Sequence, residues 1–274
     1  MPNSISKISP LIIGHRGASA LTPENTLAAF ARAIDDGANG VELDVRLARD
    51  GVPVVIHDES LRRTALREGL VAETTSSELR KADAGSWFNR AHPRLARPEY
   101  SHEFVPTLDQ VLAFFKRHPG KPAVIYVEMK TSHAENTYTD LSRSVVQLIL
   151  DHNLESRVVV VSFNLRAVAQ IKTIEPSIRT GALFEPRRNT VKTIRGHPLI
   201  TAALDCGADE ILLHRLIARR RLVELSLENH LQPVVWTVDD PGWARRAASL
   251  GIGAVITNNP AAMIKGVESA RSER

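Results

Sequence analysis

The chain alternates short apolar runs with segments whose apolar residues recur at helical spacing. The apolar runs are continuous rather than alternating, which is typical of parallel strands covered on both faces. Eight runs are expected to be strands, at residues 11–14, 41–45, 123–128, 157–162, 179–184, 209–213, 233–238 and 253–257. Helices are expected between them, at residues 25–36, 107–117, 137–151, 164–174, 190–205, 216–229, 241–249 and 260–268.

Three of the joints between a helix and the next strand share one pattern. A glycine stands where the helix should end, a short loop follows and a strand begins, with Gly37, Gly207 and Gly251 in this position. Glycine readily takes the left-handed conformation that ends a helix. Strand–helix units repeated along 274 residues predict an α/β fold, a closed (β/α)₈ TIM barrel. A doubly wound open sheet is the alternative, but no G-x-G-x-x-G motif follows the first strand.

Residues 59–104 break this alternation. The segment is polar and irregular, contains Gly69, Gly85, Pro93 and Pro98, and is too long for a loop between a strand and a helix. We therefore expect one TIM-barrel domain over residues 1–274, with a small insertion subdomain at residues 59–104. It follows the hairpin of the second barrel strand and should lie over one end of the barrel.

Composition narrows the classes of function. The formal net charge is only +4, and the basic residues are not interleaved with aromatic ones, so nucleic-acid binding is not expected. The one cysteine, Cys206, excludes an intramolecular disulfide and a cysteine-based zinc site. The N-terminal sequence lacks a signal-like apolar segment, and no apolar run approaches the roughly 18 residues that span a membrane. A cytoplasmic protein without stable membrane association is expected, and homo-oligomer formation is left open.

Charged side chains gather at the ends of the first three predicted strands, where a TIM barrel carries its functional groups. Three carboxylates aimed at one place need compensating positive charge, which a divalent cation supplies. An all-oxygen set without cysteine favours Mg²⁺ or Ca²⁺, and the sequence does not choose between them. The residues are His15 and Arg16 at the end of the first strand, Glu42 and Asp44 on the second, and Glu128 on the third with Lys130 just beyond it.

A second histidine is expected at the same place. Asp50 and Gly51, flanked by strand-like residues, are typical of a two-residue hairpin turn. Counting back along both strands from that turn places Asp44 opposite His57, with their Cβ atoms about 5 Å apart. A shift of one residue would move His57 off that face.

The combined set predicts metal-assisted cleavage of a phosphodiester. Arg16 and Lys130 suit an anionic group such as phosphate. Two histidines that titrate near neutral pH can divide the proton transfers, one activating the nucleophile and one protonating the leaving group. Trp236 lies near the end of the strand expected at 233–238, and Phe163 follows the strand expected at 157–162. Both are expected to form a wall for the apolar part of a substrate, with barrel filling as the alternative.

These motifs resemble the glycerophosphodiester phosphodiesterase family, over nearly the whole chain. The matching motifs are GHRG at 14–17, PENT at 23–26, VELDV at 41–45, DGVPVVIHD at 50–58, VEMK at 127–130 and WTVDD at 236–240. The resemblance implies a (β/α)₈ barrel whose mouth is capped by the inserted segment. The roles that it implies are an acid/base pair of His15 and His57, one divalent cation bound by Glu42, Asp44 and Glu128, and a phosphate held by Arg16 and Lys130.

The resemblance also implies a substrate class. Similar family members hydrolyse deacylated phospholipid headgroups such as glycerophosphocholine and glycerophosphoethanolamine to an alcohol and sn-glycerol 3-phosphate. The neighbouring glycerol hydroxyl can attack first, giving a cyclic phosphate that water then opens. The chain departs from the family pattern at Asp239, where the motif usually has W-T-V-N, and at Asn258, where it has T-D-x-P. Both departures lie away from the metal triad, and they bear on substrate preference more than on the reaction.

Two alternatives stay open at this point. A phospholipase-type phosphodiesterase would act on intact or lyso-phospholipids in a membrane, which requires an exposed apolar rim. Residues 59–104 offer only Trp87 and Phe88 as an aromatic pair. A non-catalytic barrel would bind phosphorylated ligands, but binding alone does not require the paired histidines.

Overall fold

Parallel strands close into a barrel in the computed structural model, which describes residues 9–118, 120, 122–131, 137–186 and 196–272. The strand order is β1-β9-β8-β7-β6-β5-β4-β2, and pairing of β1 with β2 closes the ring. The barrel strands are β1 (Leu11–His15), β2 (Gly40–Leu47), β4 (Val124–Met129), β5 (Val158–Ser162), β6 (Arg179–Phe184), β7 (Glu210–His214), β8 (Gln232–Trp236) and β9 (Ala254–Thr257). The predicted TIM barrel is confirmed.

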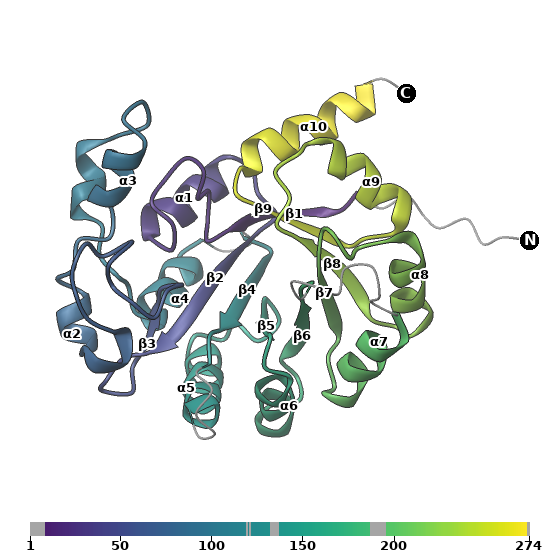
Figure 1. The fold of residues 1–274 in the computed structure, drawn as a ribbon, viewed down its shortest axis with the longest axis horizontal. Coiled ribbons are helices and arrows are strands. Elements are labelled where there is room, and N and C mark those ends of the chain that lie inside the picture. The colour runs from purple at the N-terminus through teal and green to yellow at the C-terminus, as the bar shows by residue number, and fades with distance from the viewer. Residues whose placement is uncertain (1–8, 119, 121, 132–136, 187–195, 273–274) are drawn as a thin grey trace, which may run out of the picture.

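Helices surround the strands (Figure 1). They are α1 (Leu27–Asp35), α4 (Leu108–Lys116), α5 (Thr137–Asp151), α6 (Leu165–Ile174), α7 (Gly196–Asp205), α8 (Arg220–Glu228), α9 (Gly242–Leu250) and α10 (Pro260–Ser272). No helix among the described residues is both long and apolar enough to cross a membrane.

Helix ends account for most differences from the expected boundaries. Helix α1 begins at Leu27 rather than at residue 25, because Asn25 has a left-handed φ of 58° and Thr26 is the N-cap. Helix α8 begins at Arg220 rather than at residue 216, because its N-cap Arg219 has an extended backbone. The first part of the helix expected at 190–205 lies outside the described residues. The three glycines expected at helix ends do have left-handed φ angles: 88° at Gly37, 70° at Gly207 and 79° at Gly251.

Alternation along each strand separates two apolar layers. On β4, Val124 and Tyr126 belong to the cluster inside the barrel, whereas Ile125 and Val127 pack with the helices outside it. Successive side chains of a strand point to opposite faces, so Glu128, two residues after Tyr126, faces inward as well. The inner face is therefore apolar through its middle, and a cluster of charged side chains lies near the carboxyl ends of the strands.

The hairpin after β2 corrects one prediction. Strand β3 (Pro53–Val55) pairs antiparallel with β2, with Val45 opposite Val55, and the amide of Ile56 donates to the carbonyl of Asp44 at 3.0 Å. Asp44 thus faces Ile56, and the expected pairing with His57 is wrong by one residue. The loop has three residues ending in Gly51, whose φ is 75°, which is a common hairpin geometry in which glycine takes the left-handed position.

Residues 59–104 contain short helical elements and a small apolar cluster. The elements are η1 (Val71–Glu73), α2 (Ser76–Leu79), α3 (Ser86–Ala91) and η2 (Pro98–His102). Leu61, Val71 and Leu79 pack in one cluster with Val54 and Ile56 of the hairpin. This packing fixes the segment beside β3, at one side of the barrel (Figure 1).

Candidate active site

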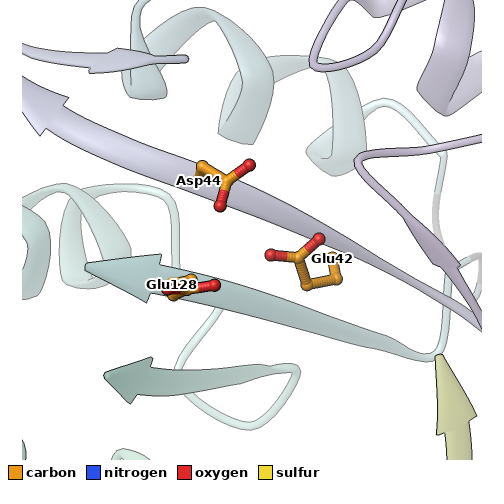
Figure 2. Close-up of side chains that lie close together, drawn as sticks. All are labelled: Glu42, Asp44 and Glu128. Carbon is orange, nitrogen blue, oxygen red and sulfur yellow. The ribbon is translucent and has the colours of Figure 1, made fainter. Parts of the chain in front are cut away.

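Strand register brings four of the predicted site residues together. His15 of β1 lies opposite Glu42 of β2, and Asp44 of β2 lies opposite Glu128 of β4. Oxygen atoms of the three carboxylates lie within 4.8 Å of one another, and the side chains point toward a common space between β2 and β4 (Figure 2). All three are buried, with Asp44 fully enclosed.

Crowding and burial shift the carboxyl groups in different directions. Burial raises the pKa of Glu42 well above its usual value, and the charges of Asp44 and Glu128 add to the shift. Burial likewise raises the pKa of Glu128 to about 7. Burial also favours the neutral form of Asp44, but Lys130 and Arg16 hold its pKa below the usual range. Like charges at this spacing resist joint ionisation unless positive charge is supplied.

Two cationic side chains lie against this cluster. The Nζ atom of Lys130 is 3.1 Å from Oδ1 of Asp44 and 2.5 Å from Oε1 of Glu128. The Nε atom of Arg16 is 3.1 Å from Oδ2 of Asp44. Both predicted phosphate-binding residues therefore reach the space that the carboxylates enclose.

The donor set fits a divalent cation. Among the described residues, the buried Oε1 of Glu42 has no hydrogen-bond partner. A buried carboxylate oxygen without a partner is costly, unless it serves as a ligand. Three carboxylates without sulfur or imidazole in the cluster make the oxygen-only set that hard cations such as Mg²⁺ and Ca²⁺ prefer.

The two predicted histidines differ in their surroundings. Nε2 of His15 is 3.9 Å from Oε2 of Glu42, and burial lowers the pKa of His15 to about 4, helped by the adjacent Arg16 charge. Nδ1 of His57 is 2.6 Å from Oδ1 of Asp58. Burial lowers the pKa of His57 too, and the hydrogen bond with Asp58 opposes the shift.

One cavity of about 330 Å³ connects these groups. The predicted residues on its wall are His15, Arg16, Glu42, His57, Glu128, Lys130, Phe163 and Trp236. His57 reaches it despite the changed hairpin register, because β3 ends at Val55 and strand alternation does not extend to residue 57. The rings of Phe163 and Trp236 meet edge to face, 5.5 Å apart. The cavity thus has a charged side at β1, β2 and β4 and an apolar side at β5 and β8.

Comparison with known proteins identifies the family. The model of the glycerophosphoryl diester phosphodiesterase family matches residues 15–262. The chain belongs to this family. It is 32% identical over 261 residues to the glycerophosphodiester phosphodiesterase of Caldanaerobacter subterraneus, with 93% of this chain and 96% of that protein covered. It is 31% identical over 268 residues to the Bacillus subtilis enzyme of the same name, covering 94% and 86%.

Solved structures of similar phosphodiesterases share the fold. A phosphodiesterase of Oleispira antarctica, solved in complex with the product sn-glycerol-3-phosphate, has a TM-score of 0.81 and 25% identity, covering 94% of this chain and 97% of that one. A glycerophosphodiester phosphodiesterase of Agrobacterium tumefaciens has a TM-score of 0.74 and 26% identity, covering 93% and 99%.

The glycines of the family's GHRG motif serve local packing. Gly17 has a φ of 82°, and a Cβ atom there would lie 2.5 Å from the carbonyl carbon of Ala29 in α1. A Cβ on Gly14 would lie 2.8 Å from the carbonyl oxygen of Gly17. The chain therefore turns tightly against α1, and Arg16 between the glycines takes a left-handed φ of 53°. This turn lets the backbone amide of Arg16 donate to Oε2 of Glu42 at 3.0 Å.

The PENT motif supplies a site residue, Asn25, to which the sequence alone assigned no role. Nδ2 of Asn25 donates to Oδ2 of Asp44 at 2.8 Å, and the Asp44 amide donates back to Oδ1 of Asn25 at 3.3 Å. Asn25 has a φ of 58°, a conformation that asparagine tolerates better than most residues. Asn25 therefore fixes the orientation of the most buried carboxylate.

Sequence reasoning missed Arg63, in the LRRT stretch of the inserted segment. Its guanidinium donates to Oδ2 of Asp58 at 2.6 Å and to Oε2 of Glu24 at 2.7 Å. Asp58 in turn contacts His57, and Glu24 accepts a hydrogen bond from Arg16 at 2.8 Å. One arginine thus links the neighbours of two cavity residues. The sequence shows the arginine, but it does not show that Arg63 contacts Glu24 of the PENT motif, 39 residues earlier.

Proposed function

We propose that this family member hydrolyses glycerophosphodiesters, such as glycerophosphocholine and glycerophosphoethanolamine, to an alcohol and sn-glycerol 3-phosphate. The observation that carries the proposal is the meeting of two histidines, two carboxylates and two cationic side chains around one cavity, with the fully buried Asp44 beside them. The product bound in the Oleispira antarctica relative supports the same substrate class.

The charged side of the cavity would bind the phosphate. Arg16 and Lys130 donate hydrogen bonds to phosphate oxygens, for which a guanidinium and an ammonium are well suited. Glu42, Asp44 and Glu128 would hold one divalent cation, Mg²⁺ or Ca²⁺, which when bound would neutralise phosphate charge and polarise phosphorus. Asn25 keeps Asp44 in place through its two hydrogen bonds.

The two histidines would move the protons. His15 is neutral near pH 7, because burial lowers its pKa to about 4, so it can take a proton from the attacking hydroxyl of water or of the substrate glycerol. Burial lowers the pKa of His57, but the charge of Asp44 and the hydrogen bond with Asp58 oppose that shift, and the imidazolium form that they support would serve as the proton donor. It gives that proton to the departing alkoxide while the new oxygen–phosphorus bond forms and the old one breaks.

The apolar side would contact the substrate's carbon atoms. Phe163 and Trp236 pack edge to face beside the charged groups. The cavity volume of about 330 Å³ is that of a small-molecule site.

A coupled assay tests the proposal. The purified protein is incubated with glycerophosphocholine or glycerophosphoethanolamine and with Mg²⁺ or Ca²⁺, and sn-glycerol 3-phosphate is detected with its dehydrogenase. Cation-dependent release is expected. A folded, cation-loaded sample that releases no product from any headgroup ester contradicts the proposal. The same assay on lysophosphatidylcholine, with liposome co-sedimentation, tests the phospholipase alternative.

A further inference from the structure

The two ring nitrogens of His15 have different neighbours: Nε2 is near Glu42, and Nδ1 begins a chain of hydrogen bonds. The Nδ1 atom is 2.7 Å from Oδ1 of Asn258. Nδ2 of Asn258 donates to Oδ2 of Asp239 at 2.8 Å, and the backbone amide of Asn258 donates to Oδ1 of Asp239, also at 2.8 Å. His15 ends β1, whereas Asn258 follows β9 and Asp239 follows β8, so these residues meet only because the barrel closes.

Asp239 determines which way the amide of Asn258 points. A carboxylate only accepts hydrogen bonds, so the amide nitrogen of Asn258 must face Asp239 and its oxygen must face His15. The hydroxyl of Ser19 donates to the same oxygen at 3.0 Å, and that of Thr257 donates to Oδ1 of Asp239 at 3.0 Å. Every contact in the chain therefore has one consistent donor and one acceptor.

The orientation of the amide in turn determines the tautomer of His15. Since Oδ1 of Asn258 cannot donate, the proton of the neutral imidazole must be on Nδ1. Its Nε2 atom is then left with a lone pair, on the side where Glu42 lies 3.9 Å away and where His15 lines the cavity.

We infer that Asp239 and Asn258 are positioning residues, which together hold His15 in the Nδ1–H tautomer with Nε2 free to accept a proton in the cavity. The inference rests on the proposed function for the proton that His15 accepts. It also accounts for the two motif departures, since an aspartate at 239 and an asparagine at 258 are the two partners of one hydrogen-bonded pair.

The two histidines are thus oriented by different chemistry. Nδ1 of His57 contacts a carboxylate directly. Nδ1 of His15 contacts the amide of Asn258, and the carboxylate of Asp239 is hydrogen-bonded to that amide. An amide can rotate by half a turn and exchange its oxygen for its nitrogen, which a carboxylate cannot do. The tautomer of His15 therefore depends on Asp239, although Asp239 does not touch the imidazole.

The substitution Asp239→Asn tests this dependence with almost no change of shape. One oxygen of residue 239 still accepts from the backbone amide of residue 258, so the new NH₂ group faces the side-chain nitrogen of Asn258. Two donors cannot pair, and the amide of Asn258 is expected to rotate. Its nitrogen then faces Nδ1 of His15, which must become the acceptor and move its proton to Nε2.

The double variant Asp239→Asn/Asn258→Asp should restore the original state. The new carboxylate at 258 accepts from the NH₂ group at 239 and from Nδ1–H of His15, so Nε2 again carries the lone pair. Asp240→Asn is the matched control, because the neighbouring Asp240 bonds to the amide of Gly242 at 2.9 Å and lies outside this chain of contacts.

Nitrogen-15 NMR of the imidazole rings reads the tautomer directly, with a His15→Gln sample to assign the signal. The expected results are Nδ1–H in the wild type, Nε2–H in Asp239→Asn and Nδ1–H in the double variant. In the coupled assay, kcat should fall about 10–100-fold in Asp239→Asn with little change in KM. Replacing a residue that orients a site residue through hydrogen bonds typically has an effect of this size. The double variant should recover most of it, and Asp240→Asn should match the wild type.

Several results would overturn the inference. A wild-type His15 protonated on Nε2 contradicts it, without any variant having to fold. So does an unchanged tautomer in Asp239→Asn, or an unchanged kcat despite an altered tautomer. The NMR measurement needs no substrate, so failure of the proposed function is separate and appears as absent turnover in a wild type that shows the expected tautomer.

Discussion

The two ends of the barrel treat buried carboxylates in opposite ways. At the amino end, Glu210 at the start of β7 accepts from the hydroxyl of Tyr126 at 2.8 Å and from Arg179 at 3.2 Å, so each of its oxygens has a donor. At the carboxyl end, Glu42 lies within a cluster of three carboxylates and leaves one oxygen without a hydrogen bond among the described residues.

The number of hydrogen bonds to each carboxylate distinguishes Glu210, a structural residue, from Glu42, a residue of the candidate site. Burial raises the pKa of Glu210 and that of Glu42, so the shifts alone do not distinguish the two sites. The hydrogen bonds do. A buried carboxylate with all its hydrogen-bond partners is tolerated by the fold, whereas one short of partners destabilises the fold and is poised to take a ligand. Each end should therefore respond differently to substitution.

The largest expected effect is the loss of turnover at the carboxyl end. His57→Ala, or His15→Ala, removes a proton-transfer group and should lower kcat by about 10²–10⁴-fold. The circular dichroism spectrum and melting temperature should stay close to those of the wild type, because both side chains line an open cavity. Unchanged turnover in either variant contradicts the assigned role.

Glu42→Gln should weaken cation binding and raise the stability of the cation-free protein. The affinity of the variant for Mg²⁺ or Ca²⁺ should fall by more than the roughly 10–100-fold that is typical when a residue hydrogen-bonded to a metal ligand is replaced, since here a charged ligand itself is lost. The cation-free variant should be more stable than the wild type at neutral pH, by about 0.5–2 kcal/mol. A carboxyl whose pKa is raised on folding loses stability as pH rises above its unfolded value, so the gap should widen from pH 5 to 8. Chemical denaturation of both proteins without cation measures the difference. A variant that unfolds at a lower denaturant concentration than the wild type would falsify the prediction.

Tyr126→Phe should show the reverse pattern at the amino end. It leaves an oxygen of Glu210 without its donor and should cost about 1–3 kcal/mol of unfolding free energy. Because the hydroxyl of Tyr126 donates to Glu210, which is not among the described residues lining the cavity, kcat and KM should stay at wild-type values. Urea denaturation and the coupled assay measure the two quantities, and a fall in kcat at full folding contradicts the division between the ends.

Cation affinity should depend on pH. Burial and neighbouring charge raise the pKa of Glu42 above its usual value and that of Glu128 to about 7, so a cation must displace protons below these values. Affinity should therefore rise between pH 6 and 8, by roughly tenfold per pH unit for each proton displaced. Titration calorimetry in two buffers of different ionisation enthalpy counts the protons. A constant affinity over this range contradicts the shifted groups.

The smallest effect is expected at the link from the inserted segment. Arg63→Gln breaks the contacts with Asp58 and Glu24. We expect kcat to fall about tenfold, within the range typical for residues that orient site residues through hydrogen bonds. Arg62→Gln is the matched control, since Arg62 pairs with the exposed Glu68. Equal activity of the two variants would show that the link does not position the site.

Local pattern was enough for the barrel and for most of its site. Continuous apolar runs marked the strands, and the carboxyl ends of parallel strands meet at one edge, so His15, Glu42 and Glu128 could be placed together before any contact was known. Asp44 follows from Glu42 by strand alternation. These features depend on neighbouring residues, whose periodicity the sequence displays directly.

Contacts between distant segments were decided by the tertiary structure. The hairpin register depended on a three-residue loop that a two-residue turn resembles in sequence, and His57 reached the cavity only because its strand ends at Val55. Arg63 and Glu24 are 39 residues apart, and His15 and Asn258 are 243 apart. Nothing in the local pattern encodes such pairs, because closure of the barrel and packing of the inserted segment bring them together. The sequence alone determined the barrel and the chemistry at its strand ends, and the tertiary structure decided which residues orient that chemistry.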